Sequence, residues 1–569
     1  MEGRMLIPLG IAFIVALFAS TVVALTLTPV LCSYMLTTKK ALKKNEQEPF
    51  VSRTLKVWYK KALEWALRHK KVVIGTSAAL LIFTIIIMTG LGRSFLPPFN
   101  EGSLTINIST MPGISLEESD NMGRMAEKIL LDIPEIQTVA RKTGRAELDE
   151  HALGVNVSEM EAPFELDERS RDEFLADVRQ RLGELKGVNI EIGQPISHRI
   201  DAMLSGTKAN IAIKLFGNDL NKLYNIGGQI KEAIQGIDGI ADLTLEQQIE
   251  RPQLQIKPKR DMLAKYGIPL PEFSEFINVA LSGKVVSQVY EGGKVFDLTV
   301  KVHDDDKANM EQIGNLMIDA NGQKVPLHYV AEILPLVGPN TISRENVQRK
   351  IVVSANVAGR DLNGVVKDIQ KTVGEQITLP EGYHVEYGGQ FESEQAASRT
   401  LFLTSVISIL LIFLLLFNEF HSMPLSSIIM LNLPLAIIGG ILSIWFTSGI
   451  ISIPAIIGFI SLFGIATRNG ILLVSHYNHL RSEGMSLHDS VVLGSLDRLN
   501  PILMTALTSA LALIPLAVGG DLPGNEIQSP MAQVILGGLL SSTLLNGFVV
   551  PIMYLLLHHK QKEIENLEM

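Results

Sequence analysis

The sequence of 569 residues is poor in cysteine, and its one thiol, Cys32, excludes an intramolecular disulfide framework. Aromatic residues make up only 6% of the chain, and a formal net charge of −9 argues against nucleic acid as a partner. Three signatures of enzyme chemistry are also missing: the Gly-x-Ser-x-Gly elbow, the P-loop and the zincin motif. These absences favour a protein that is not an enzyme, and the sequence predicts no cofactor.

Long aliphatic runs dominate what is present, and 47% of the residues are hydrophobic. A bilayer core about 30 Å thick needs about 20 helical residues to cross it. Seven stretches reach or approach that length: 8–36, 71–92, 398–417, 422–447, 452–478, 498–518 and 530–557. None of these stretches contains an aspartate or a glutamate. The sequence therefore predicts an α-helical membrane bundle of about seven transmembrane helices.

The distribution of positive charge predicts the orientation of this bundle. Lysines and arginines crowd the segment 37–70, which is therefore predicted to be a cytoplasmic loop. Residues 93–397 then lie outside, and the tail 559–569 lies inside. The segment 479–497 also falls inside, where Ser486 and Asp489 fit a capping box that predicts a short surface helix.

The large outer segment repeats one pattern of secondary structure. The stretch "SLTINIST" alternates apolar and polar residues, and Ser115 with Glu118 predicts the start of a helix that runs to about 132. Strands near 136–142 and 159–166, a helix at 170–185 and the strand "VNIEIG" complete a β-α-β-β-α-β order, the split βαβ arrangement. The order begins again at "NIAIKLFG" and finishes after an insertion. We expect two ferredoxin-like α+β subdomains, the second interrupted by another α+β subdomain.

Several short motifs, in this order, resemble the carboxy-terminal half of a resistance–nodulation–division (RND) efflux pump. They are "LTLTPVLCSYML", "LPPFNEG", "KTGRAE", "HRIDAMLSG", "GGQFE" and "NPILMTALTSALALIPL". The resemblance covers nearly the whole chain, and "KTGRAE" and "HRIDAMLSG" are more similar to the heavy-metal-efflux branch than to the multidrug branch. It implies a bacterial inner-membrane protein, a proton-driven secondary transporter whose large domain lies in the periplasm.

The resemblance also implies a division of the chain into domains. A transmembrane helix at 1–36 would be the last of the first half, and 71–92 and the five-helix bundle 398–558 would belong to the second half. Porter subdomain 1 would take 93–209, porter subdomain 2 would take 210–256 with 346–397, and a docking subdomain would take 257–345. The implied partners are a periplasmic adaptor, an outer-membrane channel, two further copies in a homotrimer, membrane lipid and the missing amino-terminal half.

One charged residue, Arg468, interrupts the apolar run "LFGIATRNGILLV". A permanent cation in a bilayer costs several kcal/mol, about 3 to above 10, and is normally paired within the bundle. Multidrug pumps have a lysine at this position and a threonine at Thr505, and the resemblance implies a proton relay that includes Arg468 and Thr505. Asn469 is added as a candidate because it is next in sequence and polar. Counting residues from the helix ends puts Arg468 and Thr505 at a similar depth. The structural alternatives are that Arg468 snorkels or pins a static contact, and that the Thr505 hydroxyl bonds to the preceding turn.

Because arginine does not titrate, the relay also needs a facing carboxylate that releases Arg468 when it is protonated. The predicted membrane runs contain no such acid, so the carboxylate would come from the missing amino-terminal half.

The identity of the cargo rests on residues of the outer segment. Copper and silver members of the family bind the ion through three methionines, and approximate alignment puts these positions at Asn107, Glu159 and Ala202. Methionines lie nearby but off register, at Met111, Met160 and Met203. A slip of one residue on a strand turns a side chain to the opposite face, so a monovalent copper site is disfavoured. Glu159, Met160 and Met203 remain the candidate metal ligands.

Divalent ions would suit oxygen and imidazole ligands instead. Such side chains gather in "ELDEHALGVNVSEMEA" and beyond it: Glu147, Asp149, Glu150, His151, Glu159, Glu161, His198 and Asp201. The alternative is a solvated loop face, because no ligand-type spacing is present. The cargo stays open between divalent metal cations and small toxic organic compounds.

The leading hypothesis is therefore the carboxy-terminal portion of a proton-driven exporter. One alternative is a non-transporting truncated remnant or scaffold that binds an adaptor, and another is a transporter of lipid or protein.

Overall fold

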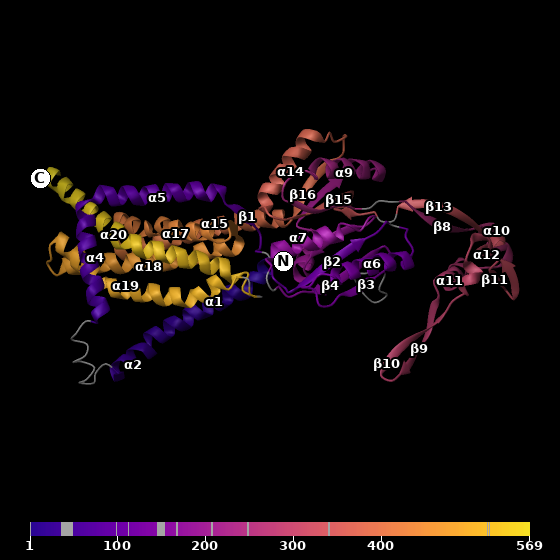
Figure 1. Ribbon diagram of the computed structural model, residues 1–569, viewed down its shortest axis with the longest axis horizontal. Helices are drawn as coiled ribbons and strands as arrows, with labels where there is room; N and C mark the ends of the chain where they lie inside the picture. Colours follow the sequence, from indigo (N-terminus) through magenta and orange to yellow (C-terminus); the bar gives the residue numbers. More distant parts are fainter. Residues whose placement is uncertain are drawn as a thin grey trace.

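The computed structural model describes residues 2–35, 49–97, 99–111, 113–144, 154–166, 169–205, 209–246, 250–339, 342–520, 522 and 524–568. The molecule is elongated, with a helical bundle at one end, an α/β body in the middle and a small inserted unit at the far end (Figure 1). The described residues contain seven helical segments long and apolar enough to cross a membrane. The bundle is thus separated from the polar body along the long axis, as expected for a membrane protein with one large extramembrane part.

The helices of the bundle have the following bounds: α1 Glu2–Leu25, α2 Leu27–Met35, α5 Lys70–Gly90, α15 Gln390–Phe420, α16 Met423–Met430, α17 Asn432–Phe446, α18 Ile453–Ser482, α19 Leu487–Val518 and α20 Gln528–Glu568. Helices α1 and α2 diverge from the others in Figure 1. A short parallel pair, β1 (Gly92–Ser94) with β17 (Ile450–Ser452), joins the end of α5 to the start of α18.

Close packing of α17, α18 and α20 forms the centre of the bundle. A Cβ on Gly439 of α17 would lie 2.0 Å from the carbonyl oxygen of Gly537 on α20, so only glycine fits there. The backbone N–H of Gly439 donates to the Ser541 hydroxyl at 3.0 Å. Small residues let membrane helices approach closely and form such polar contacts. Close packing and hydrogen bonds then stabilise the helix contact, because in lipid the hydrophobic effect does not drive helices together.

Two segments at the end of the bundle away from the α/β body differ from the sequence prediction. The segment predicted only as a loop contains α4 (Phe50–Arg68), which crosses the end of the bundle and buries Leu63, Ala66 and Leu67 (Figure 1). The short surface helix predicted at Ser486 is wrong. Ser486 does cap a helix, since its hydroxyl accepts from the Asp489 N–H at 3.1 Å, but that helix is α19 itself. The polar first turns of α19 continue into the apolar span without a break, although Pro501 lies inside the helix.

The first α/β unit begins after β1. Its elements are β2 Ser103–Ser109, α6 Leu116–Leu131, β3 Ala140–Thr143, β4 Val157–Pro163, α7 Arg171–Leu182, β5 Asn189–Gly193 and α8 Pro195–Ser205. The strands form one antiparallel sheet in the order β3-β4-β2-β5. The core lies between one face of this sheet and α6 and α7, where Leu104, Ile106 and Ile108 are buried. The predicted cap at Ser115 is confirmed, because its side chain accepts from the Glu118 N–H.

The second α/β unit repeats this order with an interruption. Its elements are β6 Ile211–Phe216, α9 Leu220–Ile234, β7 Ile240–Leu245, β14 Arg344–Glu345, β15 Gln348–Val357, α14 Leu362–Gln376 and β16 His384–Gly389. Strand β15 pairs with both β6 and β7, and β16 pairs with β6. The two halves of this sheet therefore join correctly although the insertion separates them in sequence.

The inserted unit hangs from a two-stranded neck in which β8 (Glu250–Pro258) pairs with β13 (Ala331–Pro339). Beyond the neck lie α10 Arg260–Tyr266, α11 Leu270–Leu281, β9 Lys284–Glu291, β10 Lys294–Val300, α12 Met310–Gly314, β11 Met317–Ala320, β12 Gln323–Pro326 and α13 Leu327–Val330. The hairpin β9–β10 projects away from the rest, and all its residues are exposed (Figure 1). The neck starts at Glu250, ahead of the predicted boundary at 257.

Candidate functional site

Arg468 lies on α18, on a face that the described residues do not cover. Gly464, Ser475 and His479 are exposed on the same helix face as Arg468, following helical spacing. The neighbouring Asn469 points the other way and is buried, with 1% of its surface exposed. Arg468, Ser475 and His479 make this face partly polar, and a charged side chain is unsuited to lipid, so the face is suited to contact with another polar protein surface.

Thr505 lies on α19, the antiparallel neighbour of α18. The hydroxyls of Tyr477 and Ser495 are 2.5 Å apart, and Nε2 of His476 lies 3.2 Å from Oδ2 of Asp497. Continuing this antiparallel register brings Thr505 to the level of Arg468. Within the described part of the chain, however, no hydrogen bond joins the two residues, and the Thr505 hydroxyl donates to the Ile502 carbonyl at 3.0 Å. The structure thus brings the predicted pair to one depth and leaves the side chains apart.

A second polar site crosses the sheet of the first α/β unit, on the face opposite its core. The strand register aligns Lys142, Glu159, Asn107 and Glu191 in one row across β3, β4, β2 and β5. The Lys142 ammonium lies 2.8 Å from Oε1 of Glu159. At the other end of the row, Glu191 accepts from the Thr244 hydroxyl of the second unit at 3.1 Å. The row therefore reaches from an exposed lysine to the junction between the two units.

Helix α8 lies over this row and contributes His198. The imidazole is 5% exposed, and its Nδ1 lies 3.3 Å from the Asn107 amide nitrogen. A Cβ on Gly193 would lie 1.9 Å from Nε2 of His198, so the ring fits only because that strand position has no side chain. The polar row, here called the Asn107 row, thus consists of Lys142, Glu159, Asn107 and Glu191 with His198 above it.

Glu191 was missed among the predicted site residues, although the alternation in "VNIEIG" places it on the same face as Asn107. That period-two pattern was the signal that could have found it.

The candidate metal ligands are not brought together. Glu159 faces the Asn107 row, whereas Met160 is fully buried in the core on the other face of β4. Met203 lies on α8, but its side chain, like that of Asp201, falls outside the described part. The acids Glu147, Asp149 and Glu150 and His151 also lie outside the described residues. In the ranges that are described, no three histidine, cysteine, aspartate or glutamate side chains are grouped to hold a metal.

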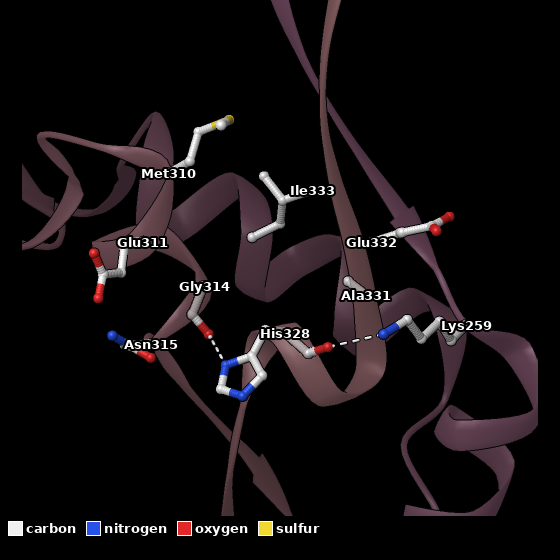
Figure 2. A pocket seen from close by; sticks show the side chains of 9 residues that line it. All are labelled: Lys259, Met310, Glu311, Gly314, Asn315, His328, Ala331, Glu332 and Ile333. Atoms are coloured by element: carbon white, nitrogen blue, oxygen red, sulfur yellow. Dashed lines mark hydrogen bonds between the residues drawn. The ribbon is translucent and has the colours of Figure 1, made fainter.

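A surface depression of about 430 Å³ lies in the inserted unit (Figure 2). His328 and Lys259 line it, and both bond to backbone: Nδ1 of His328 lies 3.0 Å from the Gly314 carbonyl, and Lys259 donates to the His328 carbonyl at 2.9 Å. These contacts fix the fold of the inserted unit, and the depression is separate from both polar sites.

Comparison with known proteins places the chain in a family. Residues 1–558 match the model of the AcrB/AcrD/AcrF family. The cobalt-zinc-cadmium resistance protein CzcA of Cupriavidus metallidurans is 33% identical over 99% of this chain and 54% of its own length. The nickel and cobalt resistance protein CnrA of the same organism is 30% identical over 97% of this chain and 52% of its own length. The cation efflux system protein CusA of Escherichia coli is 26% identical over 98% and 54%.

A crystal structure of a heavy metal efflux pump superposes with a TM-score of 0.76 at 28% identity, and the match covers 88% of this chain and 53% of that one. The chain spans about half the length of the relatives that it matches. Its similar proteins include heavy-metal resistance and cation efflux proteins, and the chain itself belongs to the AcrB/AcrD/AcrF family.

Proposed function

We propose that this chain is the carboxy-terminal portion of a proton-driven transporter of the inner membrane that exports divalent transition-metal cations from the cell. The two α/β units would be its periplasmic porter subdomains, of split βαβ type, and the inserted unit would dock an outer-membrane channel. A homotrimer with a periplasmic adaptor completes the proposed assembly.

The Asn107 row carries the choice of cargo. Approximate alignment puts two of the three methionine positions of copper and silver members at Asn107 and Glu159, and these residues are direct partners across β2 and β4. With Glu191 and His198 beside them, the site offers carboxylate, amide and imidazole groups and no thioether among its described side chains. Such donors suit divalent ions of the zinc and cobalt type better than monovalent copper. The relatives CzcA and CnrA, whose names include zinc, cobalt and nickel, support the same class.

Arg468 carries the proposal on energy coupling. Its charge is fixed, so the titrating group has to face it from elsewhere. The exposed stripe on α18 would take that contact from helices of an amino-terminal half. Protonation of the facing carboxylate would weaken the pair and let α18 move, and Thr505 on the neighbouring helix would stabilise the released state.

Calorimetric titration of the full chain with Zn²⁺ tests the cargo. We expect saturable binding that Glu159→Gln and His198→Ala each weaken, whereas Glu165→Gln, away from the Asn107 row, leaves it unchanged. Binding of Cu⁺ in preference to Zn²⁺ would contradict the divalent cargo. Absence of binding by either ion would favour the non-transporting scaffold.

A further inference from the structure

Three asparagines are buried inside the bundle on three different helices. Asn432 of α17, Asn469 of α18 and Asn546 of α20 expose 0%, 1% and 2% of their surfaces. Among the described residues, neither amide atom of Asn432 or Asn546 has a hydrogen-bond partner, and Oδ1 of Asn469 has none. A buried polar group without a hydrogen-bond partner costs about 1–3 kcal/mol. Five such atoms in one bundle therefore point to a bound ligand.

The packing of the helices places these amides at one level. A Cβ on Gly470 would lie 2.0 Å from Nδ2 of Asn432, so the Asn432 amide lies against α18 directly beside Asn469. Helices α18 and α20 run in the same direction, with Gly538 against Leu462 and the Tyr554 hydroxyl donating to Asn478 at 2.6 Å. In both contacts the residue numbers on the two helices differ by the same amount. The same difference places Asn546 level with Gly470 and its neighbour Asn469.

The backbone is also interrupted at this level. Helix α16 ends at Met430 and α17 begins at Asn432, while Leu431 between them keeps helical φ and ψ angles, and Pro434 has no N–H to donate to the Met430 carbonyl four residues earlier. A proline in a membrane helix leaves the carbonyl four residues earlier without its usual donor. Ordered water is one of the means by which such broken helices are satisfied in a bilayer.

We propose that Asn432, Asn469 and Asn546 form a buried water-binding site at the break between α16 and α17. The amides leave both nitrogens and oxygens without partners, and Pro434 leaves the Met430 carbonyl without its helical donor, so the ligand has to donate and accept hydrogen bonds. Water does both, whereas a metal cation would leave the amide nitrogens without a partner. This site faces away from the Arg468 stripe and does not depend on the proposed transport function.

A cryo-electron microscopy map of the full chain in lipid nanodiscs tests the site directly, at a resolution that shows ordered water. We expect density within about 3.2 Å of at least two of the three amides. Density with five or six oxygen neighbours at about 2.4 Å would identify a cation and overturn the proposal. Direct hydrogen bonds among the three amides, with no density between them, would also overturn it.

A double-substitution cycle gives an independent test through thermal unfolding of the full chain. Asn432→Leu and Asn546→Leu each remove one partner of a shared water, so each should lower Tm. The double variant should lower it by less than the sum of the two, because no polar group then needs the water. Pairing Asn432→Leu with Asn478→Leu, whose side chain already bonds to Tyr554, should instead be additive. Single variants that raise Tm and combine additively would show that the amides share no ligand.

Discussion

At the scale of single residues, Arg468 combines an exposed guanidinium with a position inside an apolar helix. We expect Arg468→Met to abolish proton-coupled metal export in the assembled pump, because the facing carboxylate would lose the charge that responds to its protonation. Assembly should persist, since the side chain has no partner within the described part of this chain. Export from proteoliposomes under a pH gradient measures the effect, with Thr508→Val, one turn beyond Thr505, as the control. Unchanged export by the Arg468 variant would defeat the relay.

Glu246, at the end of β7, provides a residue-scale test of pH dependence. Burial raises the pKa of its carboxyl, although the Ser343 hydroxyl and the Val352 N–H, 3.1 Å from Oε2, donate to it. The folded state then holds this proton more tightly than the unfolded chain does. The contribution of Glu246 to the free energy of unfolding is therefore largest at low pH and is lost as pH rises through the raised pKa.

Glu246→Gln should remove this loss. We expect hydrogen exchange in β7 and β15 to quicken between pH 4.5 and neutrality in the wild type, beyond the intrinsic rise of exchange with pH, and to stay flatter in the variant. The exposed Glu375→Gln is the control, and a variant that follows the wild-type profile would contradict the assignment.

At the scale of elements, residue patterns predicted those parts of the chain where one face is apolar. The strand "SLTINIST" and the cap at Ser115 lie where alternation and capping chemistry put them. The continuity of α19 escaped prediction because its polar first turns and its apolar span have different compositions. The placement of Glu191 beside Asn107 needed the strand order, which depends on contacts distant in sequence. The relay and metal residues remain predictions, because pairing of side chains across helices is not encoded in local spacing.

The contact between α17 and α20 offers a test of element packing. Gly439→Ala would press a methyl group into the Gly537 carbonyl, and the two helices have to separate to accept it. Overpacking of this kind costs about 1–3 kcal/mol. Thermal unfolding in detergent should show a lowered Tm, whereas Gly464→Ala, whose Cβ meets nothing within 4 Å, should leave Tm unchanged. Equal Tm values for the two variants would mean that this close approach contributes nothing to stability.

At the scale of the whole molecule, the uncovered stripe on α18 is the feature that a half-length chain leaves unexplained. Gly464, Arg468, Ser475 and His479 would be covered if helices of an amino-terminal half pack against it. We therefore expect a thiol placed on the stripe, by Ser475→Cys in a Cys32→Ser background, to react with a water-soluble maleimide in the chain alone. Co-production with the amino-terminal half should protect that thiol. Glu483→Cys, in the exposed turn after α18, should react in both samples. Equal labelling of Ser475→Cys with and without the other half would show that the stripe faces lipid or solvent. In that case the amino-terminal half would not place the proposed carboxylate opposite Arg468.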